Sequence, residues 1–219
     1  MSFSAALGGL LAMVAPRRCP GCDAIVDENA SSWFCEACAP LIERATGALA
    51  THAGYVYGGP LADALRRYKY GARTELARPL GELLAAEACL RFTGHVDAVV
   101  PVPLHPRRLY ARGFDPAALL ARRAAEALGA RYLPRAIARV RDTPPQASLD
   151  RGDRARNVAG CFRVRASLDD LRVLVIDDVR TTGATMFELA QTVDDAGATS
   201  IALLALAAAD PDDARTPIR

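Results

Sequence analysis

Short apolar runs alternate with stretches of helical period along the chain, and this alternation predicts an α/β fold. The apolar run from Leu171 to Ile176 is expected to form a buried strand of a parallel sheet, because such strands are covered on both faces. Met186, Leu189 and Val193 then mark a helix. The other expected elements are a short strand, a turn and a short helix within 52–71, a long helix over 74–92, a strand from Val96, a helix over 115–128, and strands over 157–164 and 199–207.

The polar residues directly after the central apolar run predict a ligand site. Two carboxylates come first, and a turn follows: Asp177, Asp178, and then Thr181, Thr182, Gly183, Ala184 and Thr185. Threonine hydroxyls, the backbone N–H groups that glycine exposes and the positive end of the next helix together suit a phosphate dianion. The turn contains no lysine, so it is not a P-loop.

The two carboxylates narrow the identity of this ligand. Asp177 and Asp178 would repel a phosphate unless they held sugar hydroxyls and a Mg²⁺ ion. A ligand with a phosphate at one end and a diol close by is a ribose 5-phosphate. The alternative is a buried strand that a polar turn simply caps. Other Asp-Asp pairs, such as 169–170 and 194–195, are interpreted as solvated turns.

Length and composition bound the class of protein. The 219 residues, 51% apolar and 24% charged, indicate one globular core domain with room for a small appendage. The net charge of +2 predicts no strong global attraction to nucleic acid. No apolar run is as long as a membrane helix, and the apolar N-terminus is expected to be a short docked helix rather than a signal peptide. We therefore expect a cytoplasmic protein without membrane insertion.

Four cysteines mark a separate N-terminal unit. They form two Cys-x-x-Cys pairs twelve residues apart: Cys19 with Cys22, and Cys35 with Cys38. Four thiolates at this spacing suit one tetrahedral Zn²⁺ in a structural role, and so short a segment needs the metal to fold. Two disulfides or a redox pair are the rival interpretations. The chain is thus divided into 1–50, the N-terminal helix and zinc-binding unit, and 51–219, the main α/β domain.

Clustered arginines follow the strand that starts near Val96. The Pro-rich loop after this strand carries Arg107, Arg108 and Arg112. Guanidinium groups held at the end of a strand suit a diphosphate, although three arginines in a loop are more often simply solvated. The position of this loop one βα unit before the ribose-phosphate turn favours the diphosphate interpretation.

A second arginine-rich stretch, 141–157, is polar, rich in proline and long for a connection inside a domain. Arg151, Arg154 and Arg156 could close over a bound diphosphate and exclude water, as a lid does. A plain linker is the alternative, and the sequence does not separate the two.

Basic and aromatic residues also gather near the first short helix. Arg66, Arg67 and Lys69 are interleaved with tyrosines, a composition that can neutralise and stack on single-stranded nucleic acid. Amphipathic packing with solvated basic tips is the simpler interpretation. Lys69 is the only lysine in the chain, against 26 arginines.

The stretch Asp-Asp-Val-x-Thr-Thr-Gly-Ala-Thr resembles the phosphoribosyl pyrophosphate (PRPP) motif of type I phosphoribosyltransferases. The resemblance implies that Asp177 and Asp178 hold the ribose hydroxyls and that residues 181–185 surround the 5-phosphate. It also implies the fold class, a parallel sheet flanked by helices, with the zinc-knuckle unit added at the N-terminus.

The order of the motifs resembles the ComF family, phosphoribosyltransferase-like proteins named for competence. Those motifs are the four-cysteine knuckle, Tyr-x-Tyr, Pro-Val-Pro-Leu-His, Arg-Gly-Phe, Thr-Pro-Pro-Gln, Arg-x-x-Asn-Val and the PRPP motif. The family usually continues Arg-Gly-Phe with Asn-Gln, whereas this chain has Asp115-Pro116, an N-cap and first-turn pair. The resemblance implies PRPP and Mg²⁺ as ligands, a role in DNA uptake, and single-stranded DNA and a competence helicase as partners. The alternative is an active PRPP-dependent transferase with an unidentified acceptor.

Overall fold

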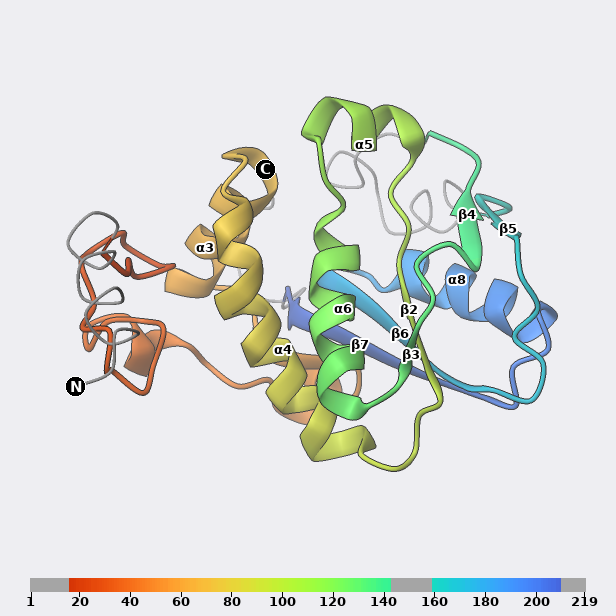
Figure 1. The fold of residues 1–219 in the computed structure, drawn as a ribbon, viewed down its shortest axis with the longest axis horizontal. Coiled ribbons are helices and arrows are strands. Elements are labelled where there is room, and N and C mark those ends of the chain that lie inside the picture. The colour runs from red at the N-terminus through yellow and green to blue at the C-terminus, as the bar shows by residue number, and fades with distance from the viewer. Residues whose placement is uncertain (1–15, 143–158, 210–219) are drawn as a thin grey trace, which may run out of the picture.

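The computed structural model describes residues 16–142 and 159–209 (Figure 1). The predicted N-terminal helix and the predicted lid arginines, Arg151, Arg154 and Arg156, lie outside these residues. The described chain is built around one sheet of five parallel strands in the order β1-β7-β6-β2-β3. These strands are β1 Ala53–Val56, β2 Ala98–Pro101, β3 Arg131–Tyr132, β6 Arg172–Arg180 and β7 Ser200–Ala208.

Helices cover both faces of the sheet (Figure 1). One face carries α3 Gly59–Tyr70, α4 Ala77–Phe92 and α6 Pro116–Leu128. The other face carries α8 Ala184–Asp195 and the antiparallel pair β4 Ile137–Arg139 and β5 Phe162–Val164. The shorter elements are η1 Ala39–Leu41, α2 Gly47–Ala50, η2 Thr74–Leu76 and α5 Pro106–Arg112. The predicted fold class, a parallel sheet flanked by helices with a small N-terminal cysteine unit, is confirmed.

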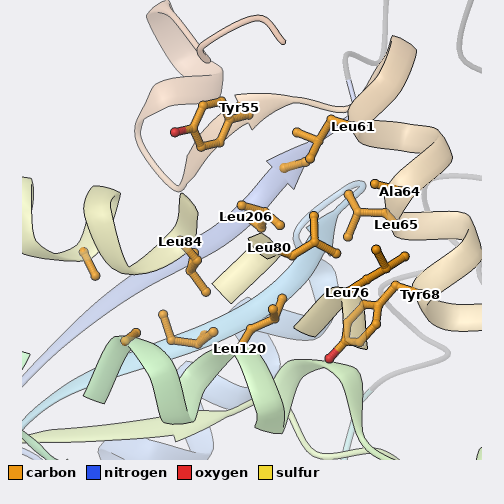
Figure 2. Close-up of a cluster of buried hydrophobic side chains, with 14 of the residues drawn as sticks. Tyr55, Leu61, Ala64, Leu65, Tyr68, Leu76, Leu80, Leu84, Leu120 and Leu206 are labelled. Carbon is orange, nitrogen blue, oxygen red and sulfur yellow. The ribbon is translucent and has the colours of Figure 1, made fainter. Parts of the chain in front are cut away.

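The strand β6 divides the core because successive side chains of a strand point to opposite faces. Leu174 and Ile176 pack with α3, α4 and α6, whereas Val173 and Val175 pack with α8. All four side chains are almost fully buried. Figure 2 shows the first of these two clusters, in which leucines from the three helices converge on Leu206 of β7. This double burial explains why the strand has a continuous apolar sequence.

The sheet changes winding direction between β2 and β6. The chain leaves β2 through α6 on one face and leaves β6 through α8 on the other. β2 pairs with β6 only as far as Pro101 opposite Ile176, while β6 continues beside β7 to Arg180 opposite Ala208. A crevice forms at the carboxyl ends of neighbouring strands whose connections diverge in this way, and ligands of α/β proteins bind in such crevices.

The predicted elements inside the described chain are confirmed, with three corrections. The strand predicted over 157–164 is shorter, because residues 159 and 160 form a turn and β5 begins only at Phe162. The central strand does not end at Ile176, because its backbone ladder with β7 continues through the polar residues to Arg180. The predicted loop at 106–112 is the helix α5, which begins with Pro106 in its first turn and has His105 as its N-cap. Asp115 caps α6 as predicted, its Oδ1 accepting from Ala118 N–H at 3.2 Å. Among the described helices, none combines the length and apolar character that a membrane span requires.

Candidate functional site

The two carboxylates of the predicted site lie in the last part of β6, past the point where β2 leaves the sheet. Oδ1 of Asp177 accepts the backbone N–H of Asp178 at 2.8 Å, and Oδ1 of Asp178 accepts the N–H of Val179 at 2.6 Å. The same Oδ1 of Asp178 lies 2.8 Å from Nζ of Lys69, which α3 supplies. Only 10% of the Asp178 side chain and 18% of the Lys69 side chain are exposed. Asp178 and Lys69 therefore form an ion pair that is largely removed from solvent.

Burial and neighbouring charges shift the pKa values of both Asp177 and Lys69. Burial, followed by the neighbouring Asp178 carboxylate, raises the pKa of Asp177 well above the usual range of an aspartate. Burial by itself lowers the pKa of Lys69, but the carboxylates of Asp178 and Asp177 outweigh it and raise that pKa above the ordinary lysine value. Lys69 is thus an ammonium ion at neutral pH. The crevice favours the approach of further hydrogen-bond donors or cations toward the two carboxylates.

The predicted phosphate turn follows β6 directly and opens α8. Gly183 is the N-cap of α8 and has a φ of +81°, a conformation that glycine adopts without strain. A Cβ at this position would lie 2.9 Å from the ring of Phe187, a half-exposed side chain that would have to shift, so the backbone angle is the stronger reason for glycine. Oγ1 of Thr182 lies 3.5 Å from the N–H of Ala184. The turn presents the first amides of a twelve-residue helix, which is the local geometry that binds anions.

A cavity of about 180 Å³ is lined by both carboxylates and by Thr185, the last residue of this turn. Its walls come from α3, from the loop and helix after β2, from β4, and from the β6–α8 region. The charged and polar residues of the wall are Lys69, Tyr70, Arg108, Arg112, Asp115, Arg139, Asp177, Asp178 and Thr185. The structure therefore brings together residues that are far apart in sequence, at the edge of the sheet where a ligand is expected.

The three predicted diphosphate-binding arginines differ in position. Arg108 and Arg112 line the cavity, and the Arg112 guanidinium lies 5.3 Å from the centre of the Tyr70 ring. Arg107 is not among the lining residues; its side chain is 82% exposed and lies 3.7 Å from Asp142. Because these arginines are on the helix α5 rather than on a loop, their side chains leave the backbone in different directions. Arg108 and Arg112, spaced four residues apart, share a face of that helix.

The sequence did not assign four of the wall residues to this site: Lys69, Tyr70, Asp115 and Arg139. Arg139 is on β4, beside the ring of Phe162, and burial together with the nearby Arg108 lowers its pKa. Asp115 ties the loop after β2 to α6, since its Oδ2 accepts Leu104 N–H at 2.9 Å, and burial raises its pKa. No local pattern marked Arg139. Lys69 had one distinguishing feature, that it is the only lysine in the chain.

The four predicted metal ligands also come together. The sulfur atoms of Cys19, Cys22, Cys35 and Cys38 all lie within 4.8 Å of one another, and all four thiols are free. A set of four sulfurs from two knuckles is the donor set of a structural Zn²⁺ site, so these residues could hold zinc. No disulfide joins any of the six cysteines, all of which the structure describes.

The cysteine unit is attached to α3 and α4 through arginines and one tryptophan. Arg67 of α3 donates to Gly21 O at 2.5 Å and also to Pro20 O, both between the first two cysteines. Trp33 lies between two arginines and donates from Nε1 to Glu82 of α4. Gly21 packs against the start of α3 so closely that a Cβ there would lie 2.6 Å from Pro60. The unit and α3 thus form a continuous packed body.

The basic and aromatic segment of α3 is mostly used inside the protein. Arg67 holds the cysteine unit, Lys69 holds Asp178, and Arg66 lies 2.5 Å from Asp63. Tyr68 is buried, with its hydroxyl donating to a backbone carbonyl of α6 at 3.0 Å. Tyr70 is different: it is 71% exposed and lies at the cavity wall. The simpler prediction, amphipathic packing, describes most of this segment.

Similar proteins were found among characterised sequences. The chain is 36% identical over 149 residues to DNA utilization protein YhgH of Salmonella typhi, a match that covers 66% of each chain and so just under two thirds of that relative. It is 31% identical over 160 residues to Competence protein F of Haemophilus influenzae, covering 70% of each chain. It is 26% identical over 193 residues to Competence protein ComFC of Streptococcus pneumoniae, covering 88% of this chain and 81% of that relative.

Similar solved structures were also found, at low scores. Phosphoribosylpyrophosphate synthetase from Mycobacterium smegmatis matches with a TM-score of 0.40 and 15% identity, over 62% of this chain and 35% of that one. Purine phosphoribosyltransferase from Pyrococcus horikoshii matches with a TM-score of 0.35 and 19% identity, over 68% of this chain and 80% of that one. No family model matches the chain.

Proposed function

The chain belongs to the ComF family of competence proteins, and from this premise we propose that it binds PRPP with Mg²⁺ at Asp177–Thr185 and serves DNA uptake. One observation supports this choice of ligand: the carboxylate pair, several basic side chains and Thr185, the last residue of the helix-opening Thr-Thr-Gly-Ala-Thr turn, border a single cavity. A phosphate, a diol and a diphosphate on one small molecule match these three features. The proposed role in DNA uptake rests on the relatives, which are named for competence and DNA utilization.

In the proposed complex each part of PRPP has its own partners. The 5-phosphate accepts the amides and hydroxyls of residues 181–185 at the start of α8. The ribose 2- and 3-hydroxyls donate to Asp177 and Asp178. The diphosphate lies toward Arg108 and Arg112, with Arg139 on the wall nearby. Arg107 is exposed outside this wall and is a weaker candidate than the sequence suggested.

Mg²⁺ fits the donor set, because carboxylate and phosphate oxygens are the ligands that this ion prefers. When bound, it would offset diphosphate charge. Asp177 and Asp178 would hold the sugar, and Arg108 and Arg112 would lie beside the negatively charged diphosphate. In the alternative function, a PRPP-dependent transferase, the bond from ribose C1 to the diphosphate oxygen would break and its electron pair would leave with the diphosphate. A nucleophile of the acceptor would form the new bond to C1, and the carboxylates would face the positive charge that develops on the ring. Asp177 and Asp178 would thus stabilise the oxocarbenium-like state without taking a proton from it.

Residues outside this wall complete the proposal. Cys19, Cys22, Cys35 and Cys38 would hold a structural Zn²⁺ that keeps the N-terminal unit folded against α3. We retain the division into 1–50 and 51–219 and the lid role of the arginines at 151, 154 and 156 as parts of the proposal.

Thermal unfolding with small ligands tests the phosphate turn. A ligand present at 100 times its Kd stabilises by about 2.7 kcal/mol, which raises the melting temperature of a chain of this size by roughly 5–10 °C. Ribose 5-phosphate should protect the parent and ribose should not. Thr185→Val should lose most of this protection, whereas Thr93→Val, at the distant end of α4, should keep it. Equal protection by ribose, or full protection of Thr185→Val, would count against a phosphate site in this turn.

The alternative function is an active PRPP-dependent transferase with an unidentified acceptor. Release of diphosphate from PRPP with any member of a nucleobase panel would favour it. Single-stranded DNA is the proposed partner for the uptake role, together with a competence helicase, and exposed aromatic rings at Tyr70 and Tyr110 are where such a strand could stack. DNA binding that survives loss of both site carboxylates would place DNA handling outside the PRPP site.

A further inference from the structure

Lys69 is a buried cation in direct contact with the site, since its Nζ lies 2.8 Å from Oδ1 of Asp178. It projects from the last turn of α3, which ends at Tyr70 and has Gly71 as its C-cap; a Cβ on Gly71 would lie 2.7 Å from Arg67 O. The preceding turn is fixed by Arg67 on the cysteine unit and by the buried Tyr68. The helix therefore holds the Lys69 ammonium at the sugar end of the cavity rather than leaving it free to move through solvent.

The choice of lysine is informative in this chain, where 26 of the 27 basic residues are arginine. A guanidinium holds a carboxylate through two parallel hydrogen bonds and occupies both oxygens. An ammonium is a single point of charge, and here it lies against Oδ1 of Asp178, the oxygen that Val179 N–H also contacts. A lysine thus offsets the charge of Asp178 through one oxygen and does not itself occupy the second, which a hydroxyl donor could then use.

The position of Lys69 also relates it to the diphosphate. In PRPP the diphosphate is attached to the ribose carbon next to the one that bears the 2-hydroxyl, so a cation beside the hydroxyl-binding carboxylates is close to diphosphate oxygens. Tyr70, the next residue of α3, lies under the Arg112 guanidinium at 5.3 Å on the same wall. Lys69 and Arg112 therefore approach one part of the cavity from two different helices.

We propose that Lys69 is a ligand-binding residue of this site, whose ammonium pairs with Asp178 in the free protein and contacts the diphosphate of the bound ligand. The inference rests on the proposed function, because it assumes that the cavity takes PRPP. In this proposal α3 has two roles: Arg67 anchors the cysteine unit, and Lys69 supplies a cation to the bound ligand. Ribose 5-phosphate has the sugar and the 5-phosphate but no diphosphate, so it should not need Lys69.

Titration calorimetry with two ligands tests the proposal. PRPP and ribose 5-phosphate, each with Mg²⁺, are titrated into the full-length parent, Lys69→Gln, Lys69→Arg and the control Arg122→Gln. Arg122 is an exposed arginine of α6 that pairs with Glu126 at 2.9 Å, away from this cavity. Lys69→Gln should weaken PRPP binding by about 10- to 100-fold, the range for one charge-assisted hydrogen bond, and leave ribose 5-phosphate binding equal or tighter. The control should bind both ligands as the parent does.

The arginine variant keeps the proposal testable if the glutamine variant does not fold. Lys69→Arg retains the charge but should hold both oxygens of Asp178, so it should weaken both ligands together. Equal weakening of both ligands in Lys69→Gln would mean that Lys69 only supports Asp178, and unchanged PRPP binding in either variant would overturn the proposal. A parent that binds neither ligand would instead refute the proposed function itself, and the inference with it.

Discussion

Glu87 offers a stability prediction that follows directly from burial and charge. Its side chain is only 2% exposed in the middle of α4, and its carboxylate is shared by two arginines. Arg91 lies 3.0 Å from Oε2, and Arg44 contacts Oε1. Arg91 also donates to Ala50 O at 2.7 Å and to Ala53 O at 3.0 Å. The network therefore joins α4 to the segment that leads into β1.

The substitution Glu87→Gln keeps the shape of the side chain and removes its charge. Breaking a buried ion pair costs about 3–5 kcal/mol when the remaining charge is trapped. Here the side chains of Arg44 and Arg91 are 59% and 24% exposed, so both can regain water in part. One amide oxygen also remains to accept a hydrogen bond. We expect a loss of about 2 kcal/mol in the free energy of unfolding, or roughly 4–8 °C in melting temperature for a chain of this size.

Urea unfolding of the parent, Glu87→Gln and Glu126→Gln measures this effect. Glu126 also pairs with two arginines, but 46% of its side chain is exposed, so the control should cost less than about 1 kcal/mol. A Glu87→Gln loss below about 0.5 kcal/mol, or a control loss of the same size as the Glu87→Gln loss, would refute the argument that burial sets the strength of this network.

Three further predictions use other parts of the structure. Removing zinc with a chelator should shift the emission of Trp33, the only tryptophan, to longer wavelength, because its packing in the cysteine unit is lost while the sheet remains folded. Gly183→Ala should destabilise the protein by about 1–3 kcal/mol and abolish ribose 5-phosphate protection, whereas Gly94→Ala, also at positive φ but in open space, should cost less and keep the protection. The hydrogen bonds from Arg172 lower the pKa of Asp97 in the folded protein. Their contribution to stability is therefore present above the pKa of an unfolded aspartate, about 4, and is lost as the pH falls below that value. Asp97→Asn should flatten the acid side of the curve of unfolding free energy against pH.

Three results would contradict these predictions in turn. Trp33 emission that does not change on chelation would mean that the metal does not hold the unit together. Equal effects of the two glycine substitutions would mean that contact with the neighbouring ring does not matter at Gly183. An acid transition that is the same with and without the Asp97 carboxylate would assign the acid sensitivity to other groups.

The sequence predicted four of the five strands of the parallel sheet, which are largely buried, and missed the short strand β3, whose two residues are exposed or half-buried. The apolar run before Asp177 is typical of a strand that is covered on both faces, and the turn at Gly183 was predicted from its residue types. The predicted end of β6 was wrong because its backbone pairing with β7 continues through polar residues, and an apolar pattern does not indicate such pairing. The helix α5 was missed because Pro106 was interpreted as part of a Pro-rich loop, although proline is common in the first turn of a helix.

The cavity residues that the sequence did not assign to the site lie far along the chain from the motifs that predicted it. Lys69 and Arg139 reach the cavity only because α3 and the β4–β5 pair fold back onto the carboxyl ends of β2 and β6. The sequence around Lys69 or Arg139 does not indicate that either side chain reaches the cavity. The cysteine cluster was predictable because its geometry is encoded by spacing within one short segment, whereas the wall of the cavity depends on packing between elements far apart in the chain.

The most direct test of the account is a calorimetric titration of PRPP with Mg²⁺ into three proteins. These are the parent, the double variant Asp177→Asn/Asp178→Asn, and the control Asp194→Asn/Asp195→Asn, an exposed acidic pair at the end of α8. We predict binding to the parent and the control and none to the double variant at 177 and 178. Absence of binding to the parent, or equal binding to both double variants, would contradict the assignment of the ligand to this carboxylate pair.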